Sequence, residues 1–334
     1  MTGGNVPYHL RPNKYVERRL FIELLEHLDR WRSIRDAAYV SMGGWLLEDH
    51  KMLHDRFDTR LLVSLEADDL IHARQLYNAP LGFINCTRED TTTFIENFDG
   101  FSARHSSAIR VIWFDYASAK NRQSQLREVQ TLISKMDAGD VLKLTMNANP
   151  RSLCDWNGIE DPTARQEAAL DGLTRKLGPY MPTGVDARQM TDEGLAAVLL
   201  EAIRKAILDG MSASPGLVAR PVTAFRYGDG PHQMVTATVV LIETTDLKEF
   251  ETKTRLANWP MTITGWGPVH AIKVPDLSLR ERFLIDSKLF VQSDAMIHDA
   301  LPFKFHRESA ESFGIFQDYV KHYRRYPSYI RVGQ

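Results

Sequence analysis

The stretch AAYVSMGGWLLEDHKMLHDRFDTRLLVSLE, residues 37–66, decides the fold of this chain. It opens with a short apolar run that ends in Gly43-Gly44, continues with the helically spaced segment 45–57 and closes with the apolar run 60–66. An apolar strand, a glycine turn, an amphipathic helix and a second apolar strand make one βαβ unit. The stretch therefore predicts two parallel strands joined by a right-handed crossover.

The same alternation continues along the chain. Further strands are predicted at 81–86, 109–116 and 140–150, and helices at 68–78, 90–98 and 121–136. Apolar strands in a parallel sheet need helices on both faces to cover them, so five such strands predict a doubly wound α/β sheet. An amphipathic helix at 14–32 precedes the first strand.

After Pro150 the pattern changes. Helices are predicted at 164–178, 191–209, 246–257, 277–290 and 308–324. Two β-branched runs, 217–227 and 232–244, flank an Asp-Gly turn and predict a hairpin that makes the sheet mixed. We therefore predict a Rossmann-like doubly wound mixed sheet of five parallel strands plus this hairpin. Its parts are an N-terminal helical segment 1–36, an α/β domain 37–245 with a helical insert 151–215, and a C-terminal helical extension 246–334.

Composition excludes several classes of protein. The chain has 334 residues, with 41 basic and 43 acidic side chains, and the net charge of −2 argues against a general polyanion binder. Two cysteines, Cys86 and Cys154, are too few for a four-thiolate zinc site or a secreted disulfide scaffold. No apolar segment reaches membrane-spanning length, and the N-terminus lacks a signal-like apolar region. We expect a cytoplasmic protein with reduced thiols and no membrane partner.

The residues that end the strands are the candidate ligand contacts, because open parallel sheets bind ligands at the carboxyl ends of their strands. Gly43 and Gly44 permit a tight turn and close approach of the main chain to a ligand. Glu66 ends the second strand, where an acid can accept hydrogen bonds from ribose hydroxyls. A dinucleotide site would need G-x-G-x-x-G, but bulky residues such as Trp45 follow the glycines, which disfavours NAD and FAD.

These motifs resemble those of the class I S-adenosylmethionine-dependent methyltransferases, over about residues 37–245, and of bacterial chains described as putative O-methyltransferases. The matching motifs are SMGG (41–44) for the glycine-rich turn, VSLEADD (63–69) for the ribose acid, INCTRED (84–90) for the adenine loop and WFDYA (113–117) for the fourth strand. The first motif departs from the family pattern, E/D-x-G-x-G-x-G, because it has no leading acid.

The resemblance implies S-adenosyl-L-methionine as cofactor. It implies cofactor contacts from Met42, Gly43, Gly44, Glu66, Ala67, Thr87, Asp90 and Asp115, with Asp90 facing the adenine amino group. It also implies that Asp115 orients the acceptor or removes its proton, and burial is expected to raise the pKa of this carboxyl. Tyr116 would bond to the acceptor or stack on it. The alternative interpretation is that Asp115 caps the following helix.

Other charged groups have two interpretations each. Arg11 and Lys14 could reach a carboxylate or a phosphate, or they are solvated cations at a helix end. His50 and His54 are spaced to share a metal ion, but no glutamate follows the first histidine, so no metal is predicted. The basic-aromatic stretch 322–331 could contact nucleic acid, although docking against the chain itself or a partner is favoured.

The leading hypothesis is a methyltransferase that uses S-adenosylmethionine to methylate an oxygen of an unidentified small-molecule or macromolecular acceptor. The insert and the C-terminal helices would enclose this acceptor, and the same helices are a candidate surface for a protein partner or a second copy. One alternative is a catalytically degenerate methyltransferase-like subunit that senses a ligand or acts as a scaffold. Another is a nucleotide-binding dehydrogenase.

Overall fold

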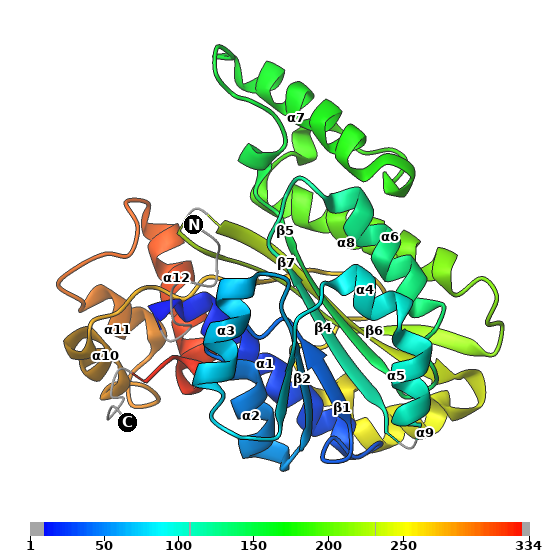
Figure 1. The fold of residues 1–334 in the computed structure, drawn as a ribbon. Helices are drawn as coiled ribbons and strands as arrows, with labels where there is room; N and C mark the ends of the chain where they lie inside the picture. The colour runs from blue at the N-terminus through cyan, green and yellow to red at the C-terminus, as the bar shows by residue number, and fades with distance from the viewer. Residues whose placement is uncertain (1–9, 107, 231, 329–334) are drawn as a thin grey trace.

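The computed structural model describes residues 10–106, 108–230 and 232–328. Its centre is an eight-stranded sheet of order β3-β2-β1-β4-β5-β7-β6-β8 (Figure 1). The strands are β1 (Ala38–Ser41), β2 (Leu61–Leu65), β3 (Ile84–Thr87), β4 (Arg110–Tyr116), β5 (Val141–Asn147), β6 (Leu217–Asp229), β7 (His232–Glu243) and β8 (His270–Ile272). The first five are parallel, and β7 runs antiparallel to both β5 and β6. The predicted doubly wound mixed sheet is thus confirmed.

Helices cover both faces of the sheet. One core includes residues of α4 (Thr91–Glu96), α5 (Phe98–Arg104), α6 (Arg122–Ile133), α7 (Pro162–Leu177) and α8 (Asp192–Gly210). The other includes residues of α1 (Pro12–Asp29), α2 (Glu48–Phe57), α9 (Leu247–Thr254), α10 (Leu279–Asp286), α11 (Asp294–Asp299) and α12 (Ser309–His322). The short helix α3 (Asp69–Asn78) joins β2 to β3. In Figure 1, α7 projects from the body of the molecule.

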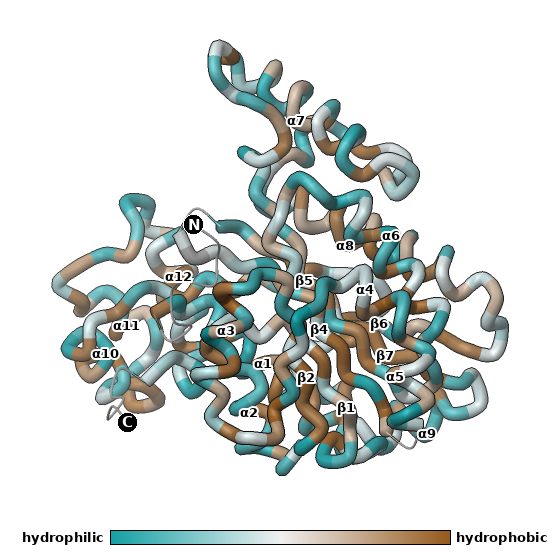
Figure 2. Tube along the Cα trace, in the orientation of Figure 1, coloured by the Kyte–Doolittle hydropathy of each residue, from teal (hydrophilic) through white to brown (hydrophobic). Residues whose placement is uncertain are grey.

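Strand β4 explains why the central strands are apolar throughout. Its residues alternate between the two cores, with Ile112 and Phe114 in one and Val111 and Trp113 in the other. The Trp113 ring meets Phe21 of α1 edge-on, with 5.4 Å between ring centroids. Figure 2 accordingly shows the hydrophobic colour concentrated on the strands. Among the described residues, no helix is both long and apolar enough to cross a bilayer.

The structure corrects three details of the predicted elements. Helix α2 begins at Glu48, three residues late, because Gly44 and Leu47 have φ values of 56° and 52°, which do not continue a helix. Helix α5 extends the predicted helix 90–98 to Arg104. The C-terminal extension also holds α11 and the strand β8, which pairs in parallel with β6. A three-residue strand is too short to show a periodic pattern.

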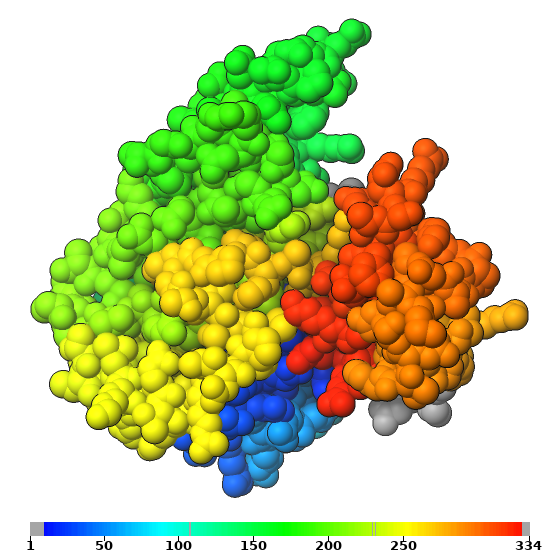
Figure 3. All heavy atoms as spheres, turned by 180° about the vertical axis from the view of Figure 1, so that it is seen from behind, coloured from blue at the N-terminus to red at the C-terminus, as the bar shows by residue number. Residues whose placement is uncertain are grey.

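The C-terminal helices lie beside α1, as the orange, red and blue segments of Figure 3 show. Arg325 binds both carboxylate oxygens of Glu23 at 2.6 and 2.7 Å. The Tyr326 hydroxyl accepts the Leu277 amide and donates to the Pro275 carbonyl. The described part of the basic-aromatic stretch therefore docks against its own chain, and residues 329–331 lie outside the described residues.

Candidate functional site

The strand register brings three of the predicted residues together. Ser41 of β1 pairs with Ser64 of β2 on one side and with Trp113 of β4 on the other. Gly43 and Glu66 follow their strands by two residues and one residue, and Asp115 is the next to last residue of β4, so all three lie at the carboxyl ends of three adjacent strands. At this carboxyl edge, the order of the strands reverses between β1 and β4: β2 and β3 follow on one side of β1, and β4 and β5 lie on the other. A doubly wound sheet binds its ligand at such a switch point.

The turn after β1 is held by side chains from β2 and α3. The Gly43 amide donates to Oγ of Ser64 at 3.2 Å, and Nε2 of Gln75 donates to the Gly44 carbonyl at 3.0 Å. Gly44 adopts the left-handed conformation that glycine tolerates best. A Cβ at Gly43 would lie 2.6 Å from Cε1 of His50. Both glycines are therefore required by the shape of the turn.

Glu66 is half-buried at the end of β2. Its Oε1 accepts the Asp68 amide at 2.9 Å. Burial raises the pKa of this carboxyl above its ordinary value. The neighbouring predicted contacts differ in exposure, since Ala67 is exposed and Met42 is half-buried.

The loop after β3 is organised as a helix start. The exposed Asp90 is the N-cap of α4 and accepts the Thr93 amide at 2.8 Å, a bond that lowers the pKa of its carboxyl. Oγ1 of Thr87 donates to the Ser64 carbonyl at 3.3 Å. The Asp90 side chain thus caps helix α4. Its contact with adenine stays a prediction.

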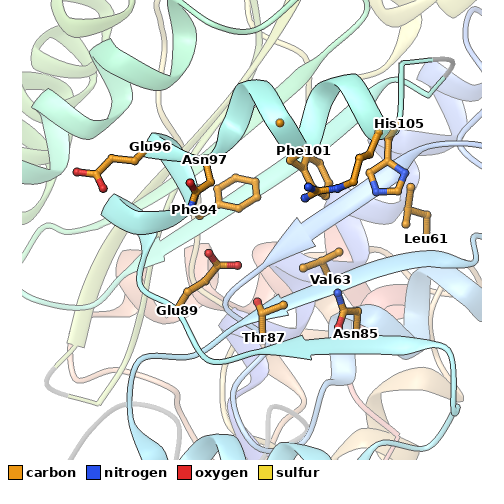
Figure 4. A pocket seen from close by; sticks show the side chains of 12 residues that line it. Leu61, Val63, Asn85, Thr87, Glu89, Phe94, Glu96, Asn97, Phe101 and His105 are labelled. Atoms are coloured by element: carbon orange, nitrogen blue, oxygen red, sulfur yellow. The ribbon is translucent and has the colours of Figure 1, made fainter.

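A cavity of about 610 Å³ lies on one face of the sheet beside its edge strand β3, between strands β2 and β3 and helices α4 and α5 (Figure 4), and it extends from Leu61 at the amino end of β2 to Glu89 after β3. Apolar side chains including Val63 and Phe94 line it, together with polar groups such as Thr87 and Glu89. Thr87 and Glu89 belong to the carboxyl end of β3, so the cavity reaches the edge that carries Glu66. We name it the edge cavity.

Asp115 lies against helix α1. Its Oδ2 is 3.1 Å from Nζ of Lys14 and 3.6 Å from a guanidinium nitrogen of Arg18. Burial alone would raise the pKa of Asp115, but these cations outweigh it, and the pKa lies below its ordinary value. The expectation of a raised pKa for Asp115 was wrong, because it considered burial alone and not the two cations that α1 brings to this carboxylate. Nor does Asp115 cap a helix, since α6 begins after Asn121.

Lys14 is the second partner in this pair. Its side chain is 9% exposed, and burial lowers its pKa to about 8. Of its two interpretations, the structure supports placement at the carboxyl edge over a solvated helix end. Arg11 precedes α1 and is half-buried.

Tyr116 points to the opposite face of β4 from Asp115, as neighbouring strand residues do. Its buried hydroxyl donates to Oε2 of Glu128 at 2.6 Å, and Thr91 donates to the same oxygen at 2.8 Å. Burial, with Glu128, raises the pKa of Tyr116 well above its ordinary value. In this structure the hydroxyl is bonded on the side away from Asp115, so its catalytic role stays a prediction.

Sequence reasoning missed Arg18 and the ion pair behind it. Glu17 of α1 and Lys143 of β5 form a fully buried salt bridge, and the Arg18 guanidinium lies 4.8 Å from the centre of the Trp113 ring. The sequence does contain a pattern that points to these charged residues. Lys14, Glu17 and Arg18 fall on the same helical face as the buried apolar stripe of α1, where charges need partners.

Two smaller cavities lie beside the β6–β7 hairpin, with volumes of about 460 and 240 Å³. Asp192 and Gln233 line both of them. The larger includes Trp156 of the insert, and the smaller includes Lys273 of the C-terminal extension. We name them the hairpin cavities. They lie at the carboxyl end of β5, because Asn147 pairs with Met234.

The two histidines of α2 are engaged by main-chain groups. Nε2 of His50 lies 3.0 Å from the Val63 carbonyl, and Nδ1 of His54 lies 3.1 Å from the Thr59 carbonyl. Each ring nitrogen that faces a carbonyl oxygen must carry a proton, so it is not a metal ligand in this state. The two rings therefore hydrogen-bond to two separate main-chain carbonyls, those of Val63 and Thr59.

The sheet order, its single antiparallel strand β7 and the switch-point edge define a Rossmann-like α/β protein of the methyltransferase kind. The chain matches the family described as "Putative O-methyltransferase" over residues 6–334, and it belongs to that family. The resemblance drawn from the sequence motifs is thereby confirmed. No protein of curated function matches the chain in sequence.

Several solved structures are similar to this chain at low identity. N-methyltransferase NodS from Bradyrhizobium japonicum WM9 shares 11% identity over 68% of this chain and 97% of its own, with a TM-score of 0.35. An O-methyltransferase from Bacillus cereus, solved in complex with SAH, shares 13% over 70% of this chain and 91% of its own, with a TM-score of 0.35. Trm1 from Pyrococcus horikoshii, solved with S-adenosyl-L-methionine, shares 12% over 91% and 75%, with a TM-score of 0.42.

Proposed function

We propose that this protein is an S-adenosylmethionine-dependent methyltransferase that methylates an oxygen of its acceptor. Beside membership of the family, one observation carries the proposal. Gly43, Glu66 and Asp115 follow paired residues of three adjacent strands by the same two positions, at the carboxyl edge that includes the reversal of strand order between β1 and β4. This arrangement supports the proposal, in which the turn and Glu66 would hold the cofactor and Asp115 would lie on the side of the reacting group.

The residues of this edge fit an adenosyl group. The turn at Gly43 and Gly44 would let the main chain approach the cofactor closely, and the Glu66 carboxylate would accept a hydrogen bond from a ribose hydroxyl. Met42 and Ala67 flank these contacts, while Thr87 leads towards the edge cavity, where the adenine ring has an apolar wall. When bound, the cofactor supplies a methyl group on a sulfonium sulfur.

The acceptor hydroxyl must lose a proton as the methyl group is transferred. Asp115 is a weak base, because its pKa is lowered by Lys14 and Arg18. Lys14 is better suited to accept the proton of the acceptor hydroxyl, since its pKa of about 8 lies close to neutral pH. We assign Lys14 as the proton acceptor and Asp115 as the group that orients it, at 3.1 Å.

The hairpin cavities are the proposed acceptor site. They lie at the carboxyl edge on the β5 side, and their lining combines residues of the insert and of the C-terminal extension. The larger, at about 460 Å³, has the size of a typical small-molecule site. The sequence led us to expect the insert and the C-terminal helices around the acceptor; in the proposed site the extension contributes β8 and Lys273 instead of a helix.

Calorimetric titration of the full chain with S-adenosylmethionine, SAH and NAD tests the cofactor. Binding of the two sulfur compounds but not NAD is expected, and binding of NAD alone would overturn the proposal. Transfer of a radiolabelled methyl group to phenols and carboxylic acids, with amines as the comparison, tests the acceptor atom. Tight binding without any transfer would favour the degenerate ligand-sensing subunit, which the departure of the glycine motif already suggests.

A further inference from the structure

A group of four polar side chains is enclosed beneath the β1 turn. Tyr39 and Ser41 come from β1, and Asp49 and His50 come from the first turn of α2. Each is at most 5% exposed. Burying charged groups is costly unless they are paired and hydrogen-bonded, so the partners of these side chains determine their role.

The hydrogen bonds join all four side chains through Asp49. Its Oδ2 accepts the Tyr39 hydroxyl at 2.7 Å and the Ser41 hydroxyl at 2.5 Å, and its Oδ1 lies 3.2 Å from Nδ1 of His50. The other ring nitrogen, Nε2, lies 3.0 Å from the Val63 carbonyl. Both nitrogens thus face oxygen atoms, and a doubly protonated imidazolium beside an ionised Asp49 satisfies both contacts. Asp49 and His50 form a buried ion pair.

The charges around the pair support this assignment. Burial alone would lower the pKa of His50, but the Asp49 carboxylate and the Val63 carbonyl raise it above its ordinary value. Burial would raise the pKa of Asp49, but His50, Ser41 and, from α1, Arg18 lower it. The Tyr39 ring packs on the His50 ring at 5.2 Å between centroids. The described elements around the pair therefore favour its charged form.

The imidazole ring also sets the position of the turn. A Cβ on Gly43 would lie 2.6 Å from Cε1 and 2.8 Å from Nδ1 of His50, so the main chain at Gly43 rests directly on the ring. On the other side, Ser64 and Gln75 hold the Gly43 amide and the Gly44 carbonyl. The turn is therefore held by contact with the His50 ring and by hydrogen bonds from Gln75 and to Ser64.

We propose that the Asp49–His50 ion pair is a positioning device for the cofactor-binding turn. It acts on the cofactor through the turn. It holds Gly43 and Gly44 in the place where the adenosyl group binds, and so it preorganises the site. The inference rests on the proposed function, because it concerns how tightly this turn binds the cofactor.

Titration of the full chain with SAH between pH 6 and 9 tests the device, using His50→Gln, Asp49→Asn and the double variant. Each single variant is expected to weaken SAH binding by about tenfold, since it leaves one buried charge without its partner. The double variant should weaken it by less than the product of the two, because its groups are both neutral. In the unaltered protein, affinity should fall as pH rises through the raised pKa of His50, and the comparison with His50→Gln separates this fall from any effect of Lys14, which titrates near pH 8.

The matched control is His54→Gln, which removes the other imidazole of α2 and should leave SAH affinity unchanged. Thermal denaturation establishes that each variant is folded. A folded His50→Gln variant with unaltered affinity would overturn the inference, as would a loss of stability without loss of affinity. If the variants do not fold, an SAH affinity of the unaltered protein that stays constant from pH 6 up to the pH at which the protein unfolds would also overturn the inference. Failure of the unaltered protein to bind SAH would instead overturn the proposed function, and this inference with it.

Discussion

The Asp115 carboxylate lies 3.1 Å from the ammonium group of Lys14, although the two residues are 101 positions apart in the chain. The contact joins the first helix to the fourth strand at the edge where the strand order reverses. Helix α1 is therefore part of the site and supplies its cations, in addition to covering one face of the sheet.

Replacing Lys14 by Met should abolish methyl transfer while cofactor binding is retained. With a pKa of about 8, Lys14 loses its proton as pH rises through that value, and its neutral amine can then accept the acceptor's proton. The rate in the unaltered protein should therefore rise through pH 8 and then level off. Release of SAH measured from pH 6 to 10 checks this. Lys135→Met, which removes the surface pair with Asp99, is the control, and a rate that falls through pH 8 would exclude Lys14 as the base.

Glu66→Gln should weaken SAH binding by about tenfold to a hundredfold. A hydrogen bond to a charged group contributes about 1.5–3 kcal/mol, and the amide keeps the shape of the side chain while removing the charge. Calorimetric titration measures the change. Asp69→Asn, three residues further on in α3, removes an exposed carboxylate that pairs with Arg88 and should leave the affinity unchanged. Equal affinities for Glu66→Gln and the unaltered protein would remove Glu66 from the ribose site.

Gly43→Ala should destabilise the protein by about 1–3 kcal/mol, the usual cost of overpacking a filled interior. The new Cβ would lie 2.6 Å from the His50 ring, and either the ring or the turn must move. Thermal denaturation and SAH titration should both show the loss. Gly82→Ala is the matched control, because no described residue lies within 4 Å of its Cβ position. Comparable melting temperatures for the two variants would show that the turn is not tightly packed.

Much of this site could be predicted from the sequence because it depends on strand ends. The apolar runs locate β1, β2 and β4, and parallel pairing then brings Gly43, Glu66 and Asp115 to one edge. The ionisation of Asp115 could not be predicted, since its cations come from a helix whose packing partner no local pattern reveals. Helix periodicity identifies α1 but does not say which strand it will contact.

The same limit applies to Tyr116 and to β8. Alternation along β4 places Tyr116 on the face opposite Asp115, but only the packing of α6 brings Glu128 to its hydroxyl. Strand β8 has three residues and is defined by pairing with β6, which lies more than 40 positions earlier in the chain. Local sequence patterns do not contain such contacts.

Tyr116→Phe distinguishes a structural from a catalytic tyrosine. The change removes the hydroxyl that donates to Glu128 at 2.6 Å, while Thr91 still donates to the same carboxylate oxygen at 2.8 Å. We expect a loss of about 1.5–3 kcal/mol in the free energy of unfolding, the usual range for a hydrogen bond to a charged group. The rate of methyl transfer and the affinity for SAH should stay near their original values, because the hydroxyl lies on the face of β4 away from Asp115. Urea denaturation and radiolabelled methyl transfer measure the two quantities. A folded, stable Tyr116→Phe variant that has lost transfer would instead give the hydroxyl a direct role and would require Tyr116 to leave Glu128 when the acceptor binds.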